Sequence, residues 1–345
     1  MMKNRLIVDL DNTITIDSSS PNYESKKINA EVARAIHNAS KLGISSTVFS
    51  ARNMNSLEGD LLEIEEITRP IAEKWLKENH VPYSDLILGK PWCGPEGWYV
   101  DDKNLSIEEF SFKYTSPFWN KSIDLIVPFF NEESAVQKVH FQNKKSERLF
   151  NINNYIYIEN GSTDHTRERL KELAENDKKI KLILLEKNLG YGGGIKAGLA
   201  KSSSSIVILN HADLQFDLYS FIYTNLDIIT IQNKTNILSK RLNRRFKDRI
   251  YSALLRAILS IILFKRIKDF NGQPKVFNRS FLGPIDNLPD NFCIDLAIYK
   301  KIFLHSIQIP IIQSERKIGE SSWSGSVKKR IKIFIDYILW AVTNR

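Results

Sequence analysis

The sequence predicts an α/β protein of two domains, and three observations carry this prediction. Short β-branched runs alternate with stretches of helical spacing along most of the 345 residues. This alternation lapses around residues 111–122 and then starts again. The charge also divides near this point, because residues 1–120 hold 13 Lys and Arg against 18 Asp and Glu, whereas the remainder holds 36 against 22. We therefore expect domains over residues 1–117 and 118–345.

Strands and helices alternate strictly in the first domain. The expected strands are 5–10, 44–50, 85–89 and 97–102, and the expected helices are 30–42 and 61–79. This order is typical of a parallel sheet with helices on both faces. Ligands bind to such sheets at the carboxyl ends of the strands.

The second domain shows the same alternation. Its apolar runs are "IDLIVPFFNEE", "YIYIENGSTD", "IKLILLE" and "SIVILNHAD", with a charged helix expected over 165–176 and a glycine-rich turn, "NLGYGGG", before a further helix. A second parallel sheet is therefore expected.

Composition excludes several classes of protein. No apolar run reaches the ~20 residues that a membrane-spanning helix needs, and the first residues lack the apolar segment of a signal peptide. Cys93 and Cys293 match no paired metal spacing, so we expect reduced thiols in a cytoplasmic protein. The basic runs are not interleaved with exposed aromatic residues, which argues against nucleic acid as a partner.

Four chemical motifs follow the strands of the first domain in order. Asp9 and Asp11 end the first strand in "VDLDNT", Ser50 ends the second, and Lys90 lies in "LGKPW". Asp101 and Asp102 end the last. All are expected at one edge of the sheet.

With "SARNM", "GKPWCGPEGWYVDDK" and "EEF", these motifs resemble the capsule-biosynthesis phosphatases of the haloacid-dehalogenase superfamily, over nearly all of the first 110 residues or so. The resemblance implies a capless, Rossmann-like domain in which Asp9 attacks phosphorus and Asp11 serves as general acid and base. It further implies phosphoryl contacts from Ser50 and Lys90. Mg²⁺ would be held at this site by the aspartates. The metal ligands of this first site would be Asp9, Asp11, Asp101 and Asp102, with Thr13, Arg52 and Asn53 contacting substrate.

One departure and one alternative accompany this resemblance. Ser50 stands where Thr is commoner, and it keeps the hydroxyl. The alternative is that these acids only cap strand ends and form turns. No gap between the motifs holds a cap-sized insertion, so the site should be open to a large or polymer-linked phosphate ester.

The motifs of the second domain resemble the family 2 glycosyltransferases of the GT-A fold, of the dolichol-phosphate-mannose-synthase type. The resemblance runs from "IDLIVPFFNEE" to "SERKIGESSW" and covers most of residues 123–323. It implies a nucleotide-sugar donor, held in part by a glycine loop that lets the backbone approach closely. Donor contacts would come from Pro128, Glu132, Glu159, Asn160, Gly190, Gly192 and Gly193.

The segment "HADLQFD" supplies the implied metal ligands, which are His211, Asp213 and Gln215. A neutral imidazole suits Mn²⁺ better than the hard ion Mg²⁺ and removes one negative charge. We expect Asp213 to be the main ligand, with weakened metal affinity. The alternative is an inactive remnant that only binds nucleotide.

The acceptor decides whether a base is needed. For a sugar hydroxyl, the resemblance makes Asp295 the base, whereas a polyprenyl phosphate would need none. Phosphate clamps and pocket-lining residues are further candidates. The expected clamps are Lys275, Arg279 and Arg316, and Asp269, Gln273 and Trp323 would line a donor or acceptor pocket.

Two apolar stretches with basic flanks follow, "IYSALLRAILSIILF" and "IFIDYILWAV". Each predicts an amphipathic helix, which could lie on an anionic membrane or pack within the domain or a homodimer. The whole sequence predicts a bifunctional enzyme of capsule or other surface-polysaccharide synthesis, peripheral to the inner face of the cell membrane. A Mg²⁺-dependent phosphatase would precede an inverting glycosyltransferase that uses Mn²⁺ or Mg²⁺ and a polyprenyl phosphate or glycan acceptor.

Overall fold

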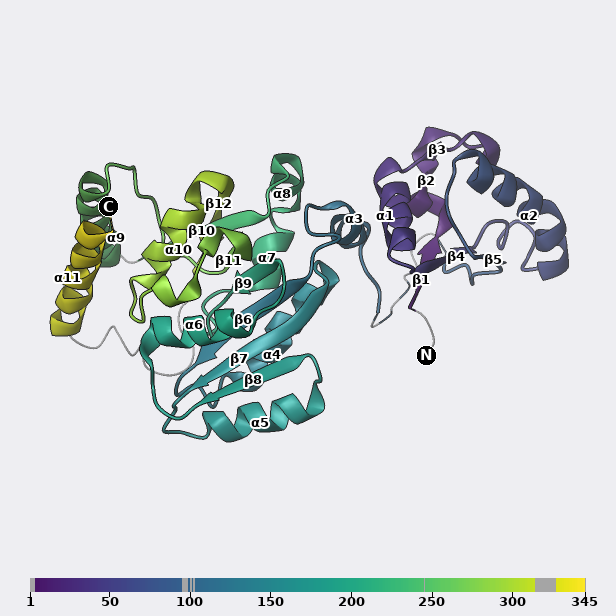
Figure 1. Cartoon of the computed structure of the whole chain (residues 1–345). Coiled ribbons are helices and arrows are strands. Elements are labelled where there is room, and N and C mark those ends of the chain that lie inside the picture. The colour runs from purple at the N-terminus through teal and green to yellow at the C-terminus, as the bar shows by residue number, and fades with distance from the viewer. Residues whose placement is uncertain are drawn as a thin grey trace. The chain divides into compact units, whose positions relative to one another are not determined.

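The structure is a computed structural model, and its chain forms two compact units, Met1–Asn120 and Lys121–Arg345. The division falls three residues after the expected one. Both units are of the α/β class, as predicted (Figure 1). The described residues are 4–94, 99, 101, 103–244, 246–313 and 327–344.

The first unit contains a parallel three-stranded sheet of order β1-β4-β5. Most of its apolar core lies around Trp75, Leu10 and Ile36. Between β1 and the first helix, the chain forms a small antiparallel hairpin, β2-β3. The fourth expected strand, 97–102, falls mostly outside the described residues. The elements are β1 (Arg5–Asp9), β2 (Thr15–Ile16), β3 (Lys27–Ile28), α1 (Ala30–Lys41), β4 (Ser45–Ser50), α2 (Leu61–Glu78), β5 (Asp85–Leu88) and α3 (Ile107–Thr115).

The second unit is built on a seven-stranded sheet of order β12-β10-β11-β9-β6-β7-β8. Only β11 runs antiparallel to its neighbours, β9 and β10. The strands are β6 (Ile123–Phe129), β7 (Ile152–Asn160), β8 (Ile180–Leu185), β9 (Ile206–Leu209), β10 (Asn236–Leu242), β11 (Lys275–Asn278) and β12 (Ser306–Ile312).

Helices cover both faces of this sheet. Ile158 packs beside Gly198 of α6, whereas the neighbouring Tyr157 hydrogen-bonds to His140 of α4. Because successive side chains of a strand point to opposite faces, α6 and α4 lie on opposite sides. The helices are α4 (Val136–Lys145), α5 (Thr166–Asn176), α6 (Gly190–Lys201), α7 (Leu218–Tyr223), α8 (Leu226–Gln232), α9 (Phe246–Ile262), α10 (Ile294–Ile302) and α11 (Val327–Thr343).

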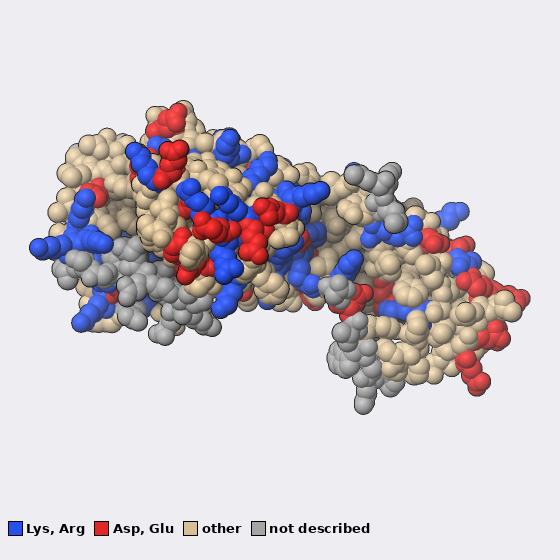
Figure 2. All heavy atoms as spheres, turned by 90° about the horizontal axis from the view of Figure 1, so that it is seen from below, with Lys and Arg blue, Asp and Glu red and all other residues tan. Residues whose placement is uncertain are grey.

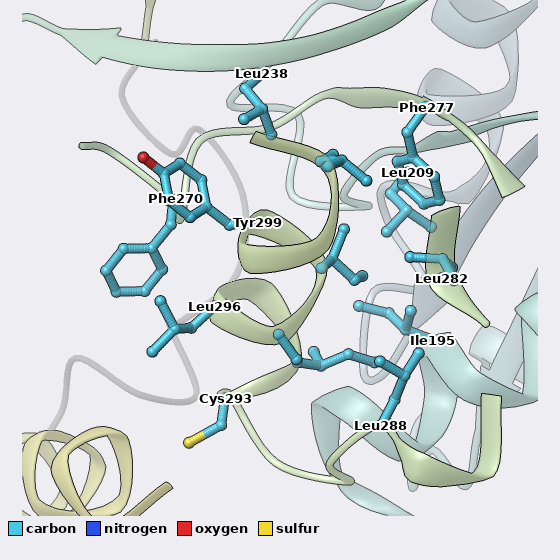
Figure 3. Close-up of a cluster of buried hydrophobic side chains, with 14 of the residues drawn as sticks. Ile195, Leu209, Leu238, Phe270, Phe277, Leu282, Leu288, Cys293, Leu296 and Tyr299 are labelled. Atoms are coloured by element: carbon cyan, nitrogen blue, oxygen red, sulfur yellow. The ribbon is translucent and has the colours of Figure 1, made fainter. Parts of the chain in front are cut away.

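One hydrophobic cluster joins the sheet to α10 and to the last helices (Figure 3). Leu255 and Leu259 of α9 and Tyr337 and Ala341 of α11 are buried in it. The expected amphipathic helices are therefore present, and each packs one apolar face on the unit. Among the described residues, no helix is both long and apolar enough to cross a membrane.

The second unit has more Lys and Arg than Asp and Glu, but on one face of the molecule these side chains lie mixed with acidic ones. In the view of Figure 2, blue and red side chains lie interspersed, so the excess of Lys and Arg forms no continuous positive surface there.

Candidate functional site

A cavity of about 310 Å³ lies where the parallel strands β6, β7 and β9 end. Carboxyl ends of parallel strands meet at one edge of a sheet, so residues distant in sequence converge there. The lining residues are Pro128, Phe129, Phe130, Glu132, Asn160, Asn188, Gly190, Tyr191, His211, Ala212, Asp213 and Phe292. We call this space the first cavity.

A second cavity, of about 110 Å³, adjoins the first. Tyr191, His211, Asp213 and Phe292 line both, so these four side chains form a common wall. The second cavity adds five charged side chains. These are Arg241 of β10, Arg244 between β10 and α9, Asp248 of α9, Asp295 of α10 and Arg330 of α11.

The common wall contains two of the three expected metal ligands. His211 Nδ1 lies 3.8 Å from Asp213 Oδ2. Gln215 lines only the second cavity, and its Oε1 accepts a hydrogen bond from Gln313 (3.2 Å). The described residues contain no group of three or more His, Cys, Asp or Glu that could hold a metal ion. An imidazole and a carboxylate therefore fit a divalent ion only if a diphosphate or water supplies its other ligands.

A buried ion pair lies behind the second cavity. Lys275 Nζ is 2.6 Å from Asp295 Oδ1, and Gln273 Nε2 is 3.2 Å from the same oxygen. Burial lowers the pKa of Lys275, and the attraction of Asp295 opposes this effect. Lys275 is fully buried, is paired with Asp295 and lines neither cavity, and its expected role as a clamp for a donor phosphate stays a prediction.

Glu159 and Asn160 end β7 but have different surroundings. Glu159 is fully buried and bonded to Arg167 (2.6 Å). It was expected to contact the donor, but it does not line the first cavity. Asn160 does line it. Its side chain also holds the glycine turn, since it accepts from the Leu189 amide and donates to the Gly190 carbonyl.

The glycines of "GYGGG" begin α6. We expected them to let the backbone approach a donor, but the structure gives two of them a different reason to lack a side chain. A Cβ on Gly192 would lie 2.4 Å from the Pro289 carbonyl oxygen, and one on Gly193 would lie 2.7 Å from Leu189 Cβ. Both glycines thus permit close packing of the chain on itself. Only Gly190, which has a φ of +77°, lines the first cavity.

Other expected contacts lie elsewhere. Arg279 follows Asn278, which pairs with Ile206 at the start of β9, so it lies at the edge of the sheet opposite these cavities. Its expected role as a phosphate clamp stays a prediction. Asp269 is paired with Arg241 (2.7 Å) and lines neither cavity. Arg316 and Trp323 lie outside the described residues.

Sequence reasoning missed several side chains around these cavities. Tyr191 stands inside the quoted glycine turn, and Arg241 and Arg244 stand in a run read only as a basic flank. Phe292, which stacks on Tyr191 with ring centres 5.1 Å apart, was not among the expected site residues.

The first unit brings four expected catalytic residues together in two pairs. Lys90 Nζ lies 2.9 Å from Asp9 Oδ1, and Ser50 Oγ donates to Asp11 Oδ2 (3.0 Å). Arg52 Nε donates to the other oxygen of Asp11 (2.7 Å). Burial raises the pKa of Asp9, although Lys90 opposes this shift.

Arg52 is the most unusual side chain of this group. Its guanidinium is buried, Tyr23 stacks over it at 4.4 Å, and neither terminal nitrogen has a partner within the described chain. Tyr23 and Tyr99, which lies beside Lys90, were not expected at this site.

The remaining expected residues of the first unit are Thr13, Asn53, Asp101 and Asp102. Thr13 lies in the turn after β1, and Asn53 donates to Thr68 of α2 (2.8 Å), so its amide is turned toward the helix. Asp101 is exposed and accepts from the Lys103 amide. Asp102 lies outside the described residues, so the expected Mg²⁺ ligand set stays a prediction.

Comparisons with known proteins identify the family of a domain in the second unit. Residues 124–282 match the model of glycosyl transferase family 2. The chain therefore contains a family 2 glycosyltransferase domain of GT-A fold, and this part of the prediction is confirmed.

Two relatives illustrate the similarity. Dolichyl-phosphate beta-glucosyltransferase ALG5D of Trichomonas vaginalis is 22% identical over 275 residues, which cover 72% of this chain and 84% of that protein. Undecaprenyl-phosphate 4-deoxy-4-formamido-L-arabinose transferase of Sodalis glossinidius is 21% identical over 234 residues, covering 66% and 70%.

One solved structure shares the fold of a large part of this chain. Glucosyl-3-phosphoglycerate synthase of Mycobacterium tuberculosis, in complex with Mn²⁺, uridine-diphosphate-glucose and phosphoglyceric acid, has a TM-score of 0.50 at 15% identity, covering 71% of this chain and 86% of that one. A crystal structure from Vibrio cholerae is 37% identical, covering 32% of this chain and 88% of that one, with a TM-score of 0.31.

Proposed function

We propose that the second unit transfers a sugar from a nucleotide sugar to the phosphate of a polyprenyl phosphate. The observation that carries this proposal is the wall shared by the two cavities. A donor in the first cavity and an acceptor in the second would meet at Tyr191, His211, Asp213 and Phe292.

The first cavity suits the donor because it lies at the carboxyl ends of the strands, the usual place for a nucleotide. His211 and Asp213 would hold a divalent ion, Mn²⁺ or Mg²⁺, there. Such an ion offsets the charge of a departing diphosphate. The Mycobacterium tuberculosis enzyme named above binds Mn²⁺ and a uridine nucleotide on the same fold.

The second cavity suits an anionic acceptor. Arg244 is half-buried and has no hydrogen bond or ion pair within the described residues. Burial and the neighbouring Arg241 lower its pKa to about 10, so it stays cationic at neutral pH. An unpaired, partly desolvated guanidinium attracts phosphate, which it can bind through two nitrogens.

The state of Asp295 favours a phosphate acceptor over a sugar hydroxyl. A hydroxyl needs a base, but Asp295 is engaged by Lys275 and Gln273. A phosphate oxygen is already ionised and attacks without a base. Both relatives named above are polyprenyl-phosphate or dolichyl-phosphate transferases by name.

This function is tested with labelled nucleotide sugars and undecaprenyl phosphate in detergent micelles. We expect labelled lipid to form with one donor of the panel, and Asp213→Ala to abolish it. Arg169→Ala, an exposed change on α5, should leave it intact. Transfer to free sugars but never to lipid phosphate would overturn the acceptor assignment.

We also propose that the first unit hydrolyses phosphate monoesters. The specific observation is the buried Arg52. Its Nε donates to the Asp11 carboxylate and its backbone N–H donates to the Ser50 hydroxyl, while its two terminal nitrogens have no partner within the described residues. Phosphoryl oxygens would draw Lys90 and Arg52 from their aspartates. Asp9 would then attack phosphorus as the ester bond breaks, and Asp11 would protonate the leaving oxygen before water releases phosphate.

The described residues place only Asp9 and Asp11 here, each paired with a cation, so no step is assigned to Mg²⁺. Phosphate release from a panel of sugar and polyol phosphates tests the activity. No turnover by the wild type, or equal turnover by Asp9→Asn, would overturn it. Both reactions suit synthesis of a capsule or other surface polysaccharide.

A further inference from the structure

A third cavity, of about 1190 Å³, lies between α9 and the part of the sheet formed by β10 and β12. It is larger than most small-molecule pockets, which enclose about 300–1,000 Å³. Arg241 and Arg244 line both this cavity and the second one, so the two spaces adjoin. The third cavity therefore has room for a ligand larger than a single small molecule.

One face of α9 forms a wall of the third cavity. Its lining residues recur at intervals of three or four positions, which places them on the same side of a helix. Leu255 and Leu259, which are buried in the hydrophobic cluster, belong to a different face. The α9 residues on the cavity side include Phe246, Arg249, Ile250, Ala253, Arg256 and Ala257.

The charge around the third cavity is almost entirely positive. Among its described lining residues, seven are Lys or Arg and one, Asp269, is acidic. Asp269 is already paired with Arg241 (2.7 Å). The other cations form no ion pair within the described part of the chain, and their uncompensated charge attracts anions. They are Lys240, Arg244, Arg249, Arg256, Arg266 and Lys268.

These cations lie close enough to affect one another. Burial lowers the pKa of Arg244 to about 10, and the positive charges of Arg241 and Arg256 add to this shift, whereas Asp269 and Asp248 oppose it. Like charges held together in this way repel one another. A bound phosphate would relieve the repulsion and can accept two hydrogen bonds from one guanidinium.

Large apolar side chains lie beside the cations. Leu242, Phe246 and Ile250 line the third cavity and are exposed, Phe246 by 73%. A soluble phosphate would leave these side chains in water. A lipid would cover them with its acyl chains while its phosphate meets the cations, so the cavity suits a ligand that is both anionic and apolar.

We propose that the third cavity binds the phosphate headgroups of anionic phospholipids, with Phe246 and Ile250 among the acyl chains. Clusters of about four to eight Lys and Arg on an amphipathic helix are typical of sites for anionic lipids. A bilayer held here would lie next to the second cavity, which the proposed function gives to a lipid phosphate. Binding of the bilayer itself requires no sugar transfer.

Co-sedimentation of the full-length protein with vesicles tests this site. We expect binding to vesicles that contain phosphatidylglycerol and little binding to vesicles of phosphatidylcholine alone. Arg249→Gln with Arg256→Gln and Arg266→Gln should weaken binding at least about 10-fold, because each Lys or Arg near an anionic surface strengthens it about fivefold. A wild type that binds both kinds of vesicle equally, or neither, would overturn the proposal.

The matched control removes the same charge near the opposite edge of the sheet, where α5 packs on the edge strand β8. It combines Arg169→Gln, Lys171→Gln and Lys178→Gln, all at exposed positions. Its vesicle binding should stay within about 2-fold of the wild type, because charges more than about 8 Å from the lipid are screened. An equal loss in the two triple variants would show a non-specific effect of charge and contradict the site.

The wild type alone supplies a second measurement, which does not depend on how the variants fold. Phosphatidylglycerol vesicles should slow hydrogen exchange in β10 and α9, and calorimetry should show that soluble, short-chain phosphatidylglycerol binds more tightly than inorganic phosphate. Equal affinity for inorganic phosphate would overturn the proposal in favour of a soluble anion. Tighter binding to alginate than to vesicles would overturn it in favour of an acidic glycan.

The lipid site and the proposed transferase can fail separately. Sugar transfer in detergent micelles by a protein that does not bind the vesicles would contradict the lipid site alone. Vesicle binding as expected, without sugar transfer to any acceptor, would contradict only the proposed function.

Discussion

Lys275 Nζ lies 2.6 Å from Asp295 Oδ1, and neither side chain has more than 6% of its surface exposed. The two residues are 20 positions apart and come from β11 and α10. A buried pair of this kind seldom adds net stability, but removal of one partner leaves an uncompensated charge in the interior.

The first prediction concerns this pair. Lys275→Met should lower the free energy of unfolding by about 3–5 kcal/mol, because Asp295 is left buried and unpaired. Lys275→Met with Asp295→Leu should recover most of this loss. Lys179→Met, which breaks an exposed pair with Glu147, should cost less than about 1 kcal/mol. Urea unfolding measures all three, and no recovery in the double variant would contradict the explanation.

The second prediction concerns the metal. We expect Mn²⁺ to support sugar transfer better than Mg²⁺ in the wild type, because imidazole suits the softer ion. His211→Asp should keep or raise activity and shift the preference toward Mg²⁺. Initial rates with each ion measure this. If His211→Asp abolishes transfer with both ions, the imidazole has a role other than ligation.

The third prediction concerns Arg244. Arg244→Gln should raise the KM for lipid phosphate about 10-fold or more, since it removes an unpaired cation from the second cavity. The KM for the nucleotide sugar should stay within about 2-fold. Arg169→Gln, an exposed change on α5, serves as the control. An equal rise in both KM values would place Arg244 at the donor instead.

The fourth prediction concerns pH and Asp9. Burial raises the folded-state pKa of Asp9 above its ordinary value of 3.8. The folded state therefore binds this proton more tightly than the unfolded state, and the stability that it contributes is lost as pH rises from below 3.8 through the raised pKa. Asp9→Asn cannot ionise, so its stability advantage should grow across this window and then level off. Urea unfolding at several pH values checks this, and an advantage that shrinks with pH would contradict it.

The fifth prediction concerns the outer faces of α9 and α11. Ile250, Leu254, Ile335 and Leu339 are exposed there, near basic side chains of the same helices. Leu254→Glu with Leu339→Glu should reduce co-sedimentation with vesicles that contain phosphatidylglycerol. Ile231→Glu, at a highly exposed position on α8, should not. Dimers in solution that these changes dissociate, without any vesicle binding, would assign the faces to a second copy instead.

Local patterns were enough to predict much of this protein. Strand–helix alternation indicated two α/β units, because buried parallel strands and amphipathic helices leave distinct periodicities in the sequence. It also placed Asp9, Asp11, Ser50 and Lys90 together, since residues that end parallel strands meet at one edge. The metal-ligand roles expected of His211 and Asp213 came instead from the resemblance to family 2 glycosyltransferases, although both residues follow one strand.

Only the tertiary structure decided which of the neighbouring candidates face a cavity. Glu159 and Asn160 are adjacent, yet strand alternation turns one toward Arg167 and the other toward the first cavity. Lys275 and Asp295 looked like separate site residues, but packing of α10 against β11 pairs them in the interior. The bonds that join Tyr191 to His211 and Gln273 span 20 and 82 positions, and such contacts arise from packing, which no local pattern records.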